Sequence, residues 1–136
     1  PHTNIYRANA VAFKTAVNHQ LPRWQQLTAN NKGVMLYHKD ASYLLARFNI
    51  PLLATVEPLA GIPTTASHIL SLVQQFKGKK GVILHTVYQG NAGIAQLASQ
   101  LGWQHMALPL EPANNSAQQA YFALIDQWLT SAANNK

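Results

Sequence analysis

The chain has 136 residues, a length that suits one domain with a sizeable hydrophobic core. Its net charge of +6 arises because there are only four acidic residues against ten lysines and arginines. The absence of cysteine excludes disulfides and thiolate metal sites. The sequence has no apolar run of about 18 residues, the length that would predict a membrane span. The first residues lack the apolar core of a signal peptide, so the signal of an exported parent would lie upstream.

The basic composition does not predict a nucleic-acid partner, although the sequence pI is about 9.9. Most lysines and arginines are dispersed along the chain, and only Lys77, Lys79 and Lys80 form a cluster. That cluster has no interleaved aromatic residue on which a base could stack.

The chain opens with a predicted helix, because apolar residues recur there at three- and four-residue spacing. They are Ala10, Phe13, Val17, Leu21 and Trp24. Pro22 predicts a kink or a break near Leu21, since proline removes a helical hydrogen bond.

Four short apolar runs follow, and each precedes a helical pattern. The runs are Val34–Tyr37, Leu52–Val56, Gly81–Leu84 and Met106–Leu108. The helix starts are predicted at Asp40, at Thr65 or Ser67, before Ile94, and at a capping box of Ser116 with Gln119. This alternation predicts an α/β fold: a four-stranded, mostly parallel sheet with helices on both faces, preceded by a long helix. No internal repeat or second domain is indicated.

Polar side chains gather where the predicted strands end. His38, Glu57, His85 and Glu111 come directly after the four runs or their short extensions, and Asp40 lies nearby. Open α/β sheets bind ligands beyond the carboxyl ends of their strands. The sequence therefore predicts metal ligands, or an acid–base pair, at this edge.

Each of these residues also has a purely structural interpretation. His38 could hydrogen-bond a neighbouring loop, and Glu57 could tie its own loop by accepting backbone N–H groups. For His85 the structural interpretation is favoured. The same holds for the remaining candidates, which are His68, Glu111 and the isolated His2, His19 and His105.

No enzyme motif is present: there is no P-loop, dinucleotide fingerprint, nucleophile elbow or H-E-x-x-H helix. Three alternatives to metal capture stay open. One is a small-molecule or signalling domain of flavodoxin-like architecture. Another is a hydrolase or transferase with His38 or His85 as general base and Glu57 as its partner. The last is an interaction module without a ligand.

Four stretches together resemble the periplasmic zinc- and manganese-binding proteins of bacterial ABC importers. Tyr6 through Trp24 is similar to that family's connecting helix, and Val34–Leu44 (VMLYHKDASYL) to its strand–His–helix element. Glu57–Pro63 (EPLAGIP), with His68 after it, is similar to the family's E-P-x-x-G-I-x-P-[ST]-x-x-H-[LI] signature. Leu101-Gly-Trp followed by Leu108-Pro-Leu resembles the family's last strand.

The resemblance implies a division of the chain and a metal site. Residues 4–30 match the connecting helix, and residues 31–136 match the C-terminal lobe of a two-lobed protein whose N-terminal lobe is absent here. His38 matches a family metal ligand, and Glu57 matches a signature position at the cleft edge. The aspartate that many members carry on the last strand is missing, since that stretch reads Leu108-Pro109-Leu110.

The implied function is capture of a cation without a reaction, followed by delivery to the membrane permease of an ABC importer. The expected location is periplasmic. His38, Glu57 and His85 are the expected ligands, and their side chains should converge on one side of the sheet. Zinc is the expected metal, because neutral imidazole suits it, and manganese is the alternative because it favours carboxylates.

Overall fold

The computed structural model describes residues 2–59, 61–90, 92–113 and 118–135. Its centre is a sheet of β1 (Val34–Leu36), β2 (Leu52–Thr55), β3 (Val82–Thr86) and β4 (Gln104–Leu108). The strand order is β2-β1-β3-β4, and every pair is parallel. The predicted α/β class with a four-stranded sheet is confirmed.

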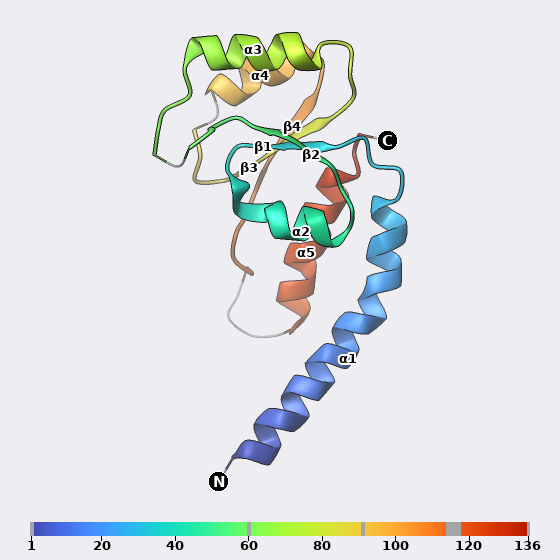
Figure 1. The fold of residues 1–136 in the computed structure, drawn as a ribbon. Coiled ribbons are helices and arrows are strands. Elements are labelled where there is room, and N and C mark those ends of the chain that lie inside the picture. The colour runs from blue at the N-terminus through green and yellow to red at the C-terminus, as the bar shows by residue number, and fades with distance from the viewer. Residues whose placement is uncertain (1, 60, 91, 114–117, 136) are drawn as a thin grey trace.

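Helices cover both faces of this sheet (Figure 1). On one face lie α1 (Thr3–Thr28), α2 (Ser42–Arg47) and α5 (Gln118–Ala132), and on the other lie α3 (Ala66–Phe76) and α4 (Ala92–Leu101). The chain runs outward from β1 to β2 and then returns to β3 on the other side of β1. The chain after β1 therefore crosses to one side of the sheet and the chain after β3 crosses to the other, which creates a switch point between their carboxyl ends.

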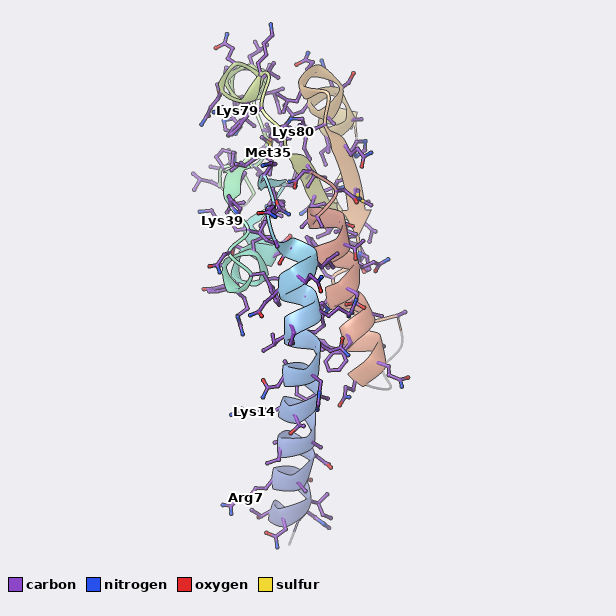
Figure 2. All side chains as sticks on the ribbon, turned by 90° about the vertical axis from the view of Figure 1, so that its right-hand side faces the viewer. Arg7, Lys14, Met35, Lys39, Lys79 and Lys80 are labelled. Atoms are coloured by element: carbon purple, nitrogen blue, oxygen red, sulfur yellow. The ribbon has the colours of Figure 1, made fainter. Side chains whose placement is uncertain are left out.

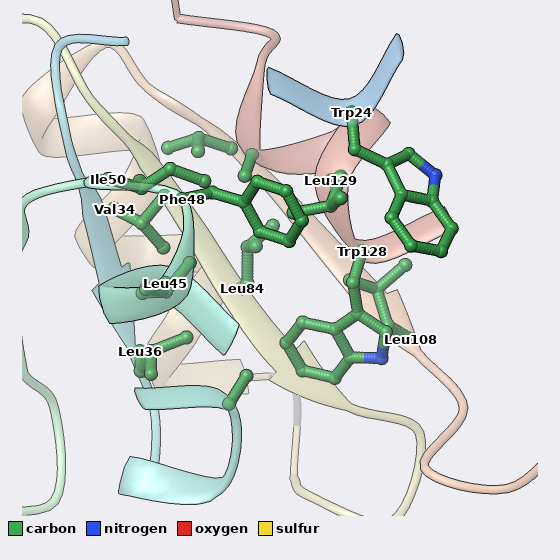
Figure 3. Close-up of a cluster of buried hydrophobic side chains, with 13 residues drawn as sticks. Trp24, Val34, Leu36, Leu45, Phe48, Ile50, Leu84, Leu108, Trp128 and Leu129 are labelled. Atoms are coloured by element: carbon green, nitrogen blue, oxygen red, sulfur yellow. The ribbon is translucent and has the colours of Figure 1, made fainter. Parts of the chain in front are cut away.

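Two hydrophobic clusters lie on the two faces, because successive strand residues point to opposite sides. The first cluster takes Val34 and Leu36 from β1 and packs them with helix residues such as Trp24 and Trp128 (Figure 3). The second cluster takes Met35 from β1 and packs it against α3, α4 and the Trp103 ring. Burying each large apolar side chain contributes roughly 1.5–3 kcal/mol, so the sheet is stabilised from both faces.

A kink or a break was predicted near Leu21, and the structure shows no break: α1 continues through Pro22 to Thr28. Proline costs this helix one backbone hydrogen bond. Side-chain contacts of the residues that follow Pro22 hold the last turns of the helix in place. Asp126 of α5 accepts hydrogen bonds from the side chains of both Arg23 and Trp24. Trp24 and Thr28 are the buried residues of α1, so its packing is concentrated in the carboxyl-terminal half.

The amino-terminal half of α1 extends away from the sheet (Figure 1). Ile5, Tyr6 and Val11 are exposed there, and Tyr6 is 69% exposed. Phe13 marks the transition, because its ring contacts Tyr121 and Phe122 of α5. None of the helices in the described ranges combines the length and apolar character needed to cross a membrane.

Asparagine side chains join the end of α5 to the turn between α1 and β1. Asn31 donates to the carbonyl of Ala132, and Asn135 donates to the carbonyl of Gly33. Asn135 also accepts from the Lys32 backbone N–H at 3.2 Å. These bonds connect segments that are far apart in the sequence, since Asn135 and Gly33 are 102 residues apart.

Three predicted helix starts have different outcomes. Thr65 is confirmed as the cap of α3, because its hydroxyl accepts the His68 N–H. The prediction of Asp40 as a cap is wrong: Asp40 lies inside a short 3-10 turn, η1 (Lys39–Ala41), and its carboxylate accepts from Gln89. The proposed cap Ser116 lies outside the described residues.

Basic side chains are spread along the whole molecule (Figure 2). Arg7 and Lys14 lie on α1, Lys39 lies near the middle, and Lys79 and Lys80 lie at the opposite end. This dispersal gives no continuous basic stripe of the kind that tracks a nucleic-acid backbone.

Candidate metal site

His38 is positioned by the inner strand β1. The next residue back, Tyr37, donates its N–H to the Leu84 carbonyl of β3 at 3.0 Å, which keeps β1 paired up to that point. The chain then turns into η1, for which His38 occupies the cap position without a side-chain capping bond. The imidazole is therefore free to interact beyond the sheet edge, and its side chain is 28% exposed.

Glu57 is positioned by the neighbouring strand β2. Its backbone N–H donates to the Tyr37 carbonyl at 3.0 Å, so the pairing of β1 with β2 continues one step past the strands themselves. Its Oε1 accepts the Gly61 N–H at 3.0 Å. Gly61 has φ +79°, a backbone conformation that favours glycine, and this turn directs its N–H at the carboxylate.

His38 and Glu57 form a close pair. His38 Nε2 lies 2.6 Å from Glu57 Oε2, and the Glu57 side chain is only 9% exposed. Two ligands on one tetrahedral zinc ion lie about 3.3 Å apart, so the observed separation is that of a hydrogen bond. Glu57 therefore orients the imidazole in this state and leaves Nδ1 with a lone pair. Joint ligation through Nε2 requires the two atoms to move apart by about 0.7 Å.

His85 lies inside β3 and has a different partner. Its Nε2 is 3.4 Å from Nδ1 of His105 in β4, and the two rings are stacked with a centroid distance of 5.6 Å. Its Nδ1 donates to the Thr86 carbonyl at 3.2 Å. Burial lowers the pKa of His85; the Thr86 hydrogen bond opposes this effect and the neighbouring His105 adds to it.

The predicted convergence of three ligands is therefore only partly met. The structure brings His38 to Glu57, whereas His85 pairs with His105. Among the described residues, no group of three or more His, Asp or Glu side chains is arranged to hold a metal ion.

The structural interpretation accounts for His68. Its Nε2 lies 3.2 Å from the carbonyl of Thr55, at the end of β2, so the side chain ties α3 to the sheet. Nearby, the Thr64 hydroxyl donates to the Val56 carbonyl at 3.0 Å. Together these contacts hold the signature loop that carries Glu57. Glu111 is exposed.

A hydrogen-bonded bridge crosses the switch point between the two inner strands. Gln89 accepts the Thr86 N–H at 2.8 Å and donates to Asp40 at 3.3 Å. The bridge thus joins the loop after β3 to η1, two residues from His38.

The sequence interpretation missed Gln89 and His105. The fourth strand was expected to begin at Met106, which left His105 outside the sheet, but β4 begins at Gln104. An earlier strand start would have placed His105 in the sheet, but its position next to His85 depends on the register of β3 with β4. Gln89 belongs to no sequence motif, so nothing in the sequence pointed to its hydrogen bonds with Thr86 and Asp40.

A family model described as zinc-uptake complex component A periplasmic (ZnuA) matches residues 1–135. The chain belongs to this family. The family resemblance found in the sequence is thus confirmed. No curated protein matches the sequence.

Solved structures share the fold. A structure of ZnuA has a TM-score of 0.80 at 16% identity, covering 98% of this chain and 51% of that one. The protein FpvC from Pseudomonas aeruginosa, in complex with Mn²⁺, has a TM-score of 0.77 at 20% identity, covering 97% and 51%. The laminin-binding protein Lmb of Streptococcus agalactiae, described as having adhesin and metal transporting activity, has a TM-score of 0.74 at 19% identity, covering 96% and 54%. The chain therefore spans about half the length of these proteins.

Proposed function

We propose that this chain is the C-terminal lobe of a two-lobed extracytoplasmic protein that captures a divalent metal ion for an ABC importer. Residues 4–30 would form the connecting helix and residues 31–136 the lobe. Membership of the zinc-uptake family supports this function, and so does the coverage of about half of each neighbouring structure. The partners would be the N-terminal lobe and the membrane permease.

The observation that carries the proposal is the pair of His38 and Glu57. Imidazole and carboxylate are both ligands of zinc and related cations. A ligating histidine usually gives its other ring nitrogen to a carboxylate or carbonyl, which fixes its tautomer. The 2.6 Å contact of Nε2 with Glu57 has this form, and it leaves Nδ1 as the ligand atom. Direct ligation by Glu57 would instead use Nε2 of His38 as the partner ligand, with Nε2 and Oε2 about 0.7 Å further apart than the observed 2.6 Å.

The exposed surface beside this pair supports a second lobe. Loops beyond the carboxyl ends of β2 and β3 present exposed apolar side chains, and Tyr88 alone is 74% exposed. The others are Leu59, Ile62 and Val87. A lobe closing over this edge would bury them and would supply the remaining ligands that a zinc site of about four ligands requires.

Zinc is the cargo that we propose, with manganese as the alternative. The chain offers imidazole and one carboxylate here, and the last strand carries no aspartate next to Leu108. Fewer carboxylates favour zinc over manganese. Capture needs no reaction, and no nucleophile is paired with His38, which is why we do not propose the hydrolase alternative.

Isothermal titration calorimetry with zinc tests the proposal. In the full-length parent, which includes the N-terminal lobe, replacing His38 with Ala should weaken binding by roughly one to three orders of magnitude, more than the 10–100-fold typical of outer-shell changes. Binding should also weaken below about pH 6, because a ligating imidazole must be deprotonated and histidine ordinarily titrates near pH 6.5. Titrations at pH 5.5 and 7.5 would measure both effects.

His19→Ala is the matched control, because His19 is an exposed histidine on α1. It should bind zinc at His38 as the unmodified chain does. Unchanged zinc affinity in His38→Ala at pH 7.5 would refute metal capture at this edge. A ligand that binds there without metal would then favour the small-molecule domain.

A further inference from the structure

We infer that His85 and His105 form a second metal site, separate from His38 and Glu57, for a divalent transition metal of the zinc–nickel–copper group. Both residues lie on the sheet face that α3 and α4 cover, since His85 follows Ile83 by two positions and His105 pairs with Ile83 in register. The fold thus brings together two imidazoles that are 20 residues apart in the sequence.

The spacing of the ring nitrogens is that of two ligands on one cation. His85 Nε2 and His105 Nδ1 are 3.4 Å apart. Nitrogen atoms at zinc distances of about 2.0–2.1 Å and a tetrahedral angle lie about 3.3 Å apart. A hydrogen bond prefers about 2.7–3.2 Å, so this contact is long for a hydrogen bond and suitable for joint ligation without a change in backbone position.

The hydrogen bond on the far side of His85 fixes the tautomer that a ligand needs. Nδ1 of His85 donates to the Thr86 carbonyl at 3.2 Å, which leaves the lone pair on Nε2. Backbone carbonyls commonly hold metal-ligating histidines in this way. Burial of the ring, which is 3% exposed, also favours the neutral form because it lowers the pKa of His85.

His105 provides access from the sheet edge. It lies on the outer strand β4 and is half-buried, while the next residue on the same face, Ala107, is exposed. In the metal-free protein its Nδ1–H donates to His85 Nε2. When a cation binds, His105 moves its proton from Nδ1 to Nε2 through solvent, so two neutral imidazoles ligate with no net release of protons. Water completes the coordination shell.

Imidazole ¹H–¹⁵N correlation spectra of the 136-residue chain, titrated with Zn²⁺ and separately with Ni²⁺ at pH 7.5, test this inference. Zn²⁺ should shift His85 Nε2 and His105 Nδ1, and the paramagnetic Ni²⁺ should broaden the resonances of both rings. The same responses should persist in His38→Gln, which removes only the first site. The response of His38 itself is read separately, so failure of one site is distinguished from failure of the other.

The decisive variant is His105→Gln, which changes a half-buried ring at the edge and keeps His85 in the core. Zinc affinity at His85 should fall by more than about tenfold, while His19→Gln, on the exposed surface of α1, should leave it unchanged. Unmoved His85 and His105 resonances at millimolar zinc would overturn the inference. So would equal zinc affinity in His105→Gln and the unmodified chain.

Discussion

His38 lies just beyond the end of β1, and His85 lies near the end of the adjacent parallel strand β3. The sheet nevertheless gives these two histidines different partners. His38 lies beyond the end of β1, is partly exposed, and meets the carboxylate of Glu57 at 2.6 Å. His85 lies within β3, is buried, and meets the imidazole of His105 at 3.4 Å. In the register of the two strands, His38 lies one position further along than His85. The side chain of His38 therefore extends beyond the sheet, whereas that of His85 stays on one of its faces.

This difference explains why proximity to the carboxyl edge is a necessary but insufficient guide to a binding site. The edge rule identifies the strands, but the alternation of side chains decides which residues leave the sheet and which stay between layers. The partner then sets the chemistry. A carboxylate accepts a hydrogen bond from the imidazole of His38, whereas burial and the neighbouring His105 lower the pKa of His85 and favour its neutral form.

The largest effect that would sharpen this comparison is expected for Glu57→Gln. The amide keeps the size of the side chain but removes the negative charge that orients His38. Zinc affinity measured by calorimetry should fall about 10–100-fold if Glu57 only orients the imidazole. A loss as large as that of His38→Ala would instead identify Glu57 as a direct ligand.

Gly61→Ala should have the next largest effect. Its φ of +79° is costly for a residue with a Cβ, so the variant should lose about 1–2 kcal/mol of unfolding free energy in urea titrations. Gly93→Ala is the matched control, because Gly93 lies inside α4 with open space around it. Equal stability of the two variants would show that the loop adapts and that Gly61 does not fix Glu57.

Gln89→Ala tests whether the two inner strand ends are mechanically joined. The variant removes one hydrogen-bond partner from Thr86 and one from Asp40. We expect a loss of about 0.5–1.5 kcal/mol in unfolding free energy. Zinc binding at His38 should weaken less than in Glu57→Gln, and a larger weakening would mean that η1 depends on this bridge.

The smallest effect should be the dependence of stability on pH through His85. Burial lowers the pKa of His85 in the folded chain, and the Thr86 hydrogen bond limits this shift. The unfolded histidine binds protons below about pH 6.5, and the folded one does so only at lower pH. The stabilisation is therefore complete above about pH 6.5 and is lost as the pH falls toward the folded pKa.

Urea titrations at pH 7.5 and 5.5, each without metal, would measure this contribution. The unmodified chain should lose more unfolding free energy on acidification than His85→Gln does. If both lose the same amount, burial of His85 has no effect on its protonation.

Much of the fold could be predicted from the sequence, because its signals were local. Apolar runs such as Val34–Tyr37 placed β1 correctly to within one residue, and the position before an apolar stripe narrowed the cap of α3 to Thr65 or Ser67, of which the structure has Thr65. The closeness of His38 and Glu57 could be predicted because each residue follows a parallel strand, and parallel strands end at the same edge of the sheet. These features depend on neighbours in sequence or on the general behaviour of parallel sheets.

The features that were missed depend on tertiary contacts. Pro22 predicted a kink or a break, but the helix does not break there, because Arg23 and Trp24 are bonded to Asp126 of α5. The partner of His85 depended on the register of β3 with β4, which no local pattern specifies. Asp40 accepts from a glutamine 49 residues away rather than capping its own helix.

The asparagine bonds between the end of α5 and the turn before β1 have a consequence for the order of folding. During synthesis β1 emerges before its main partners, because its central position in the sheet requires β3 and its flanking turn requires Asn135, which lies 102 residues beyond Gly33. Contacts of such long sequence separation slow folding, because the entropy of closing the loop is lost before the contact forms. We expect β1 to remain unprotected from hydrogen exchange during synthesis until the end of α5 has emerged.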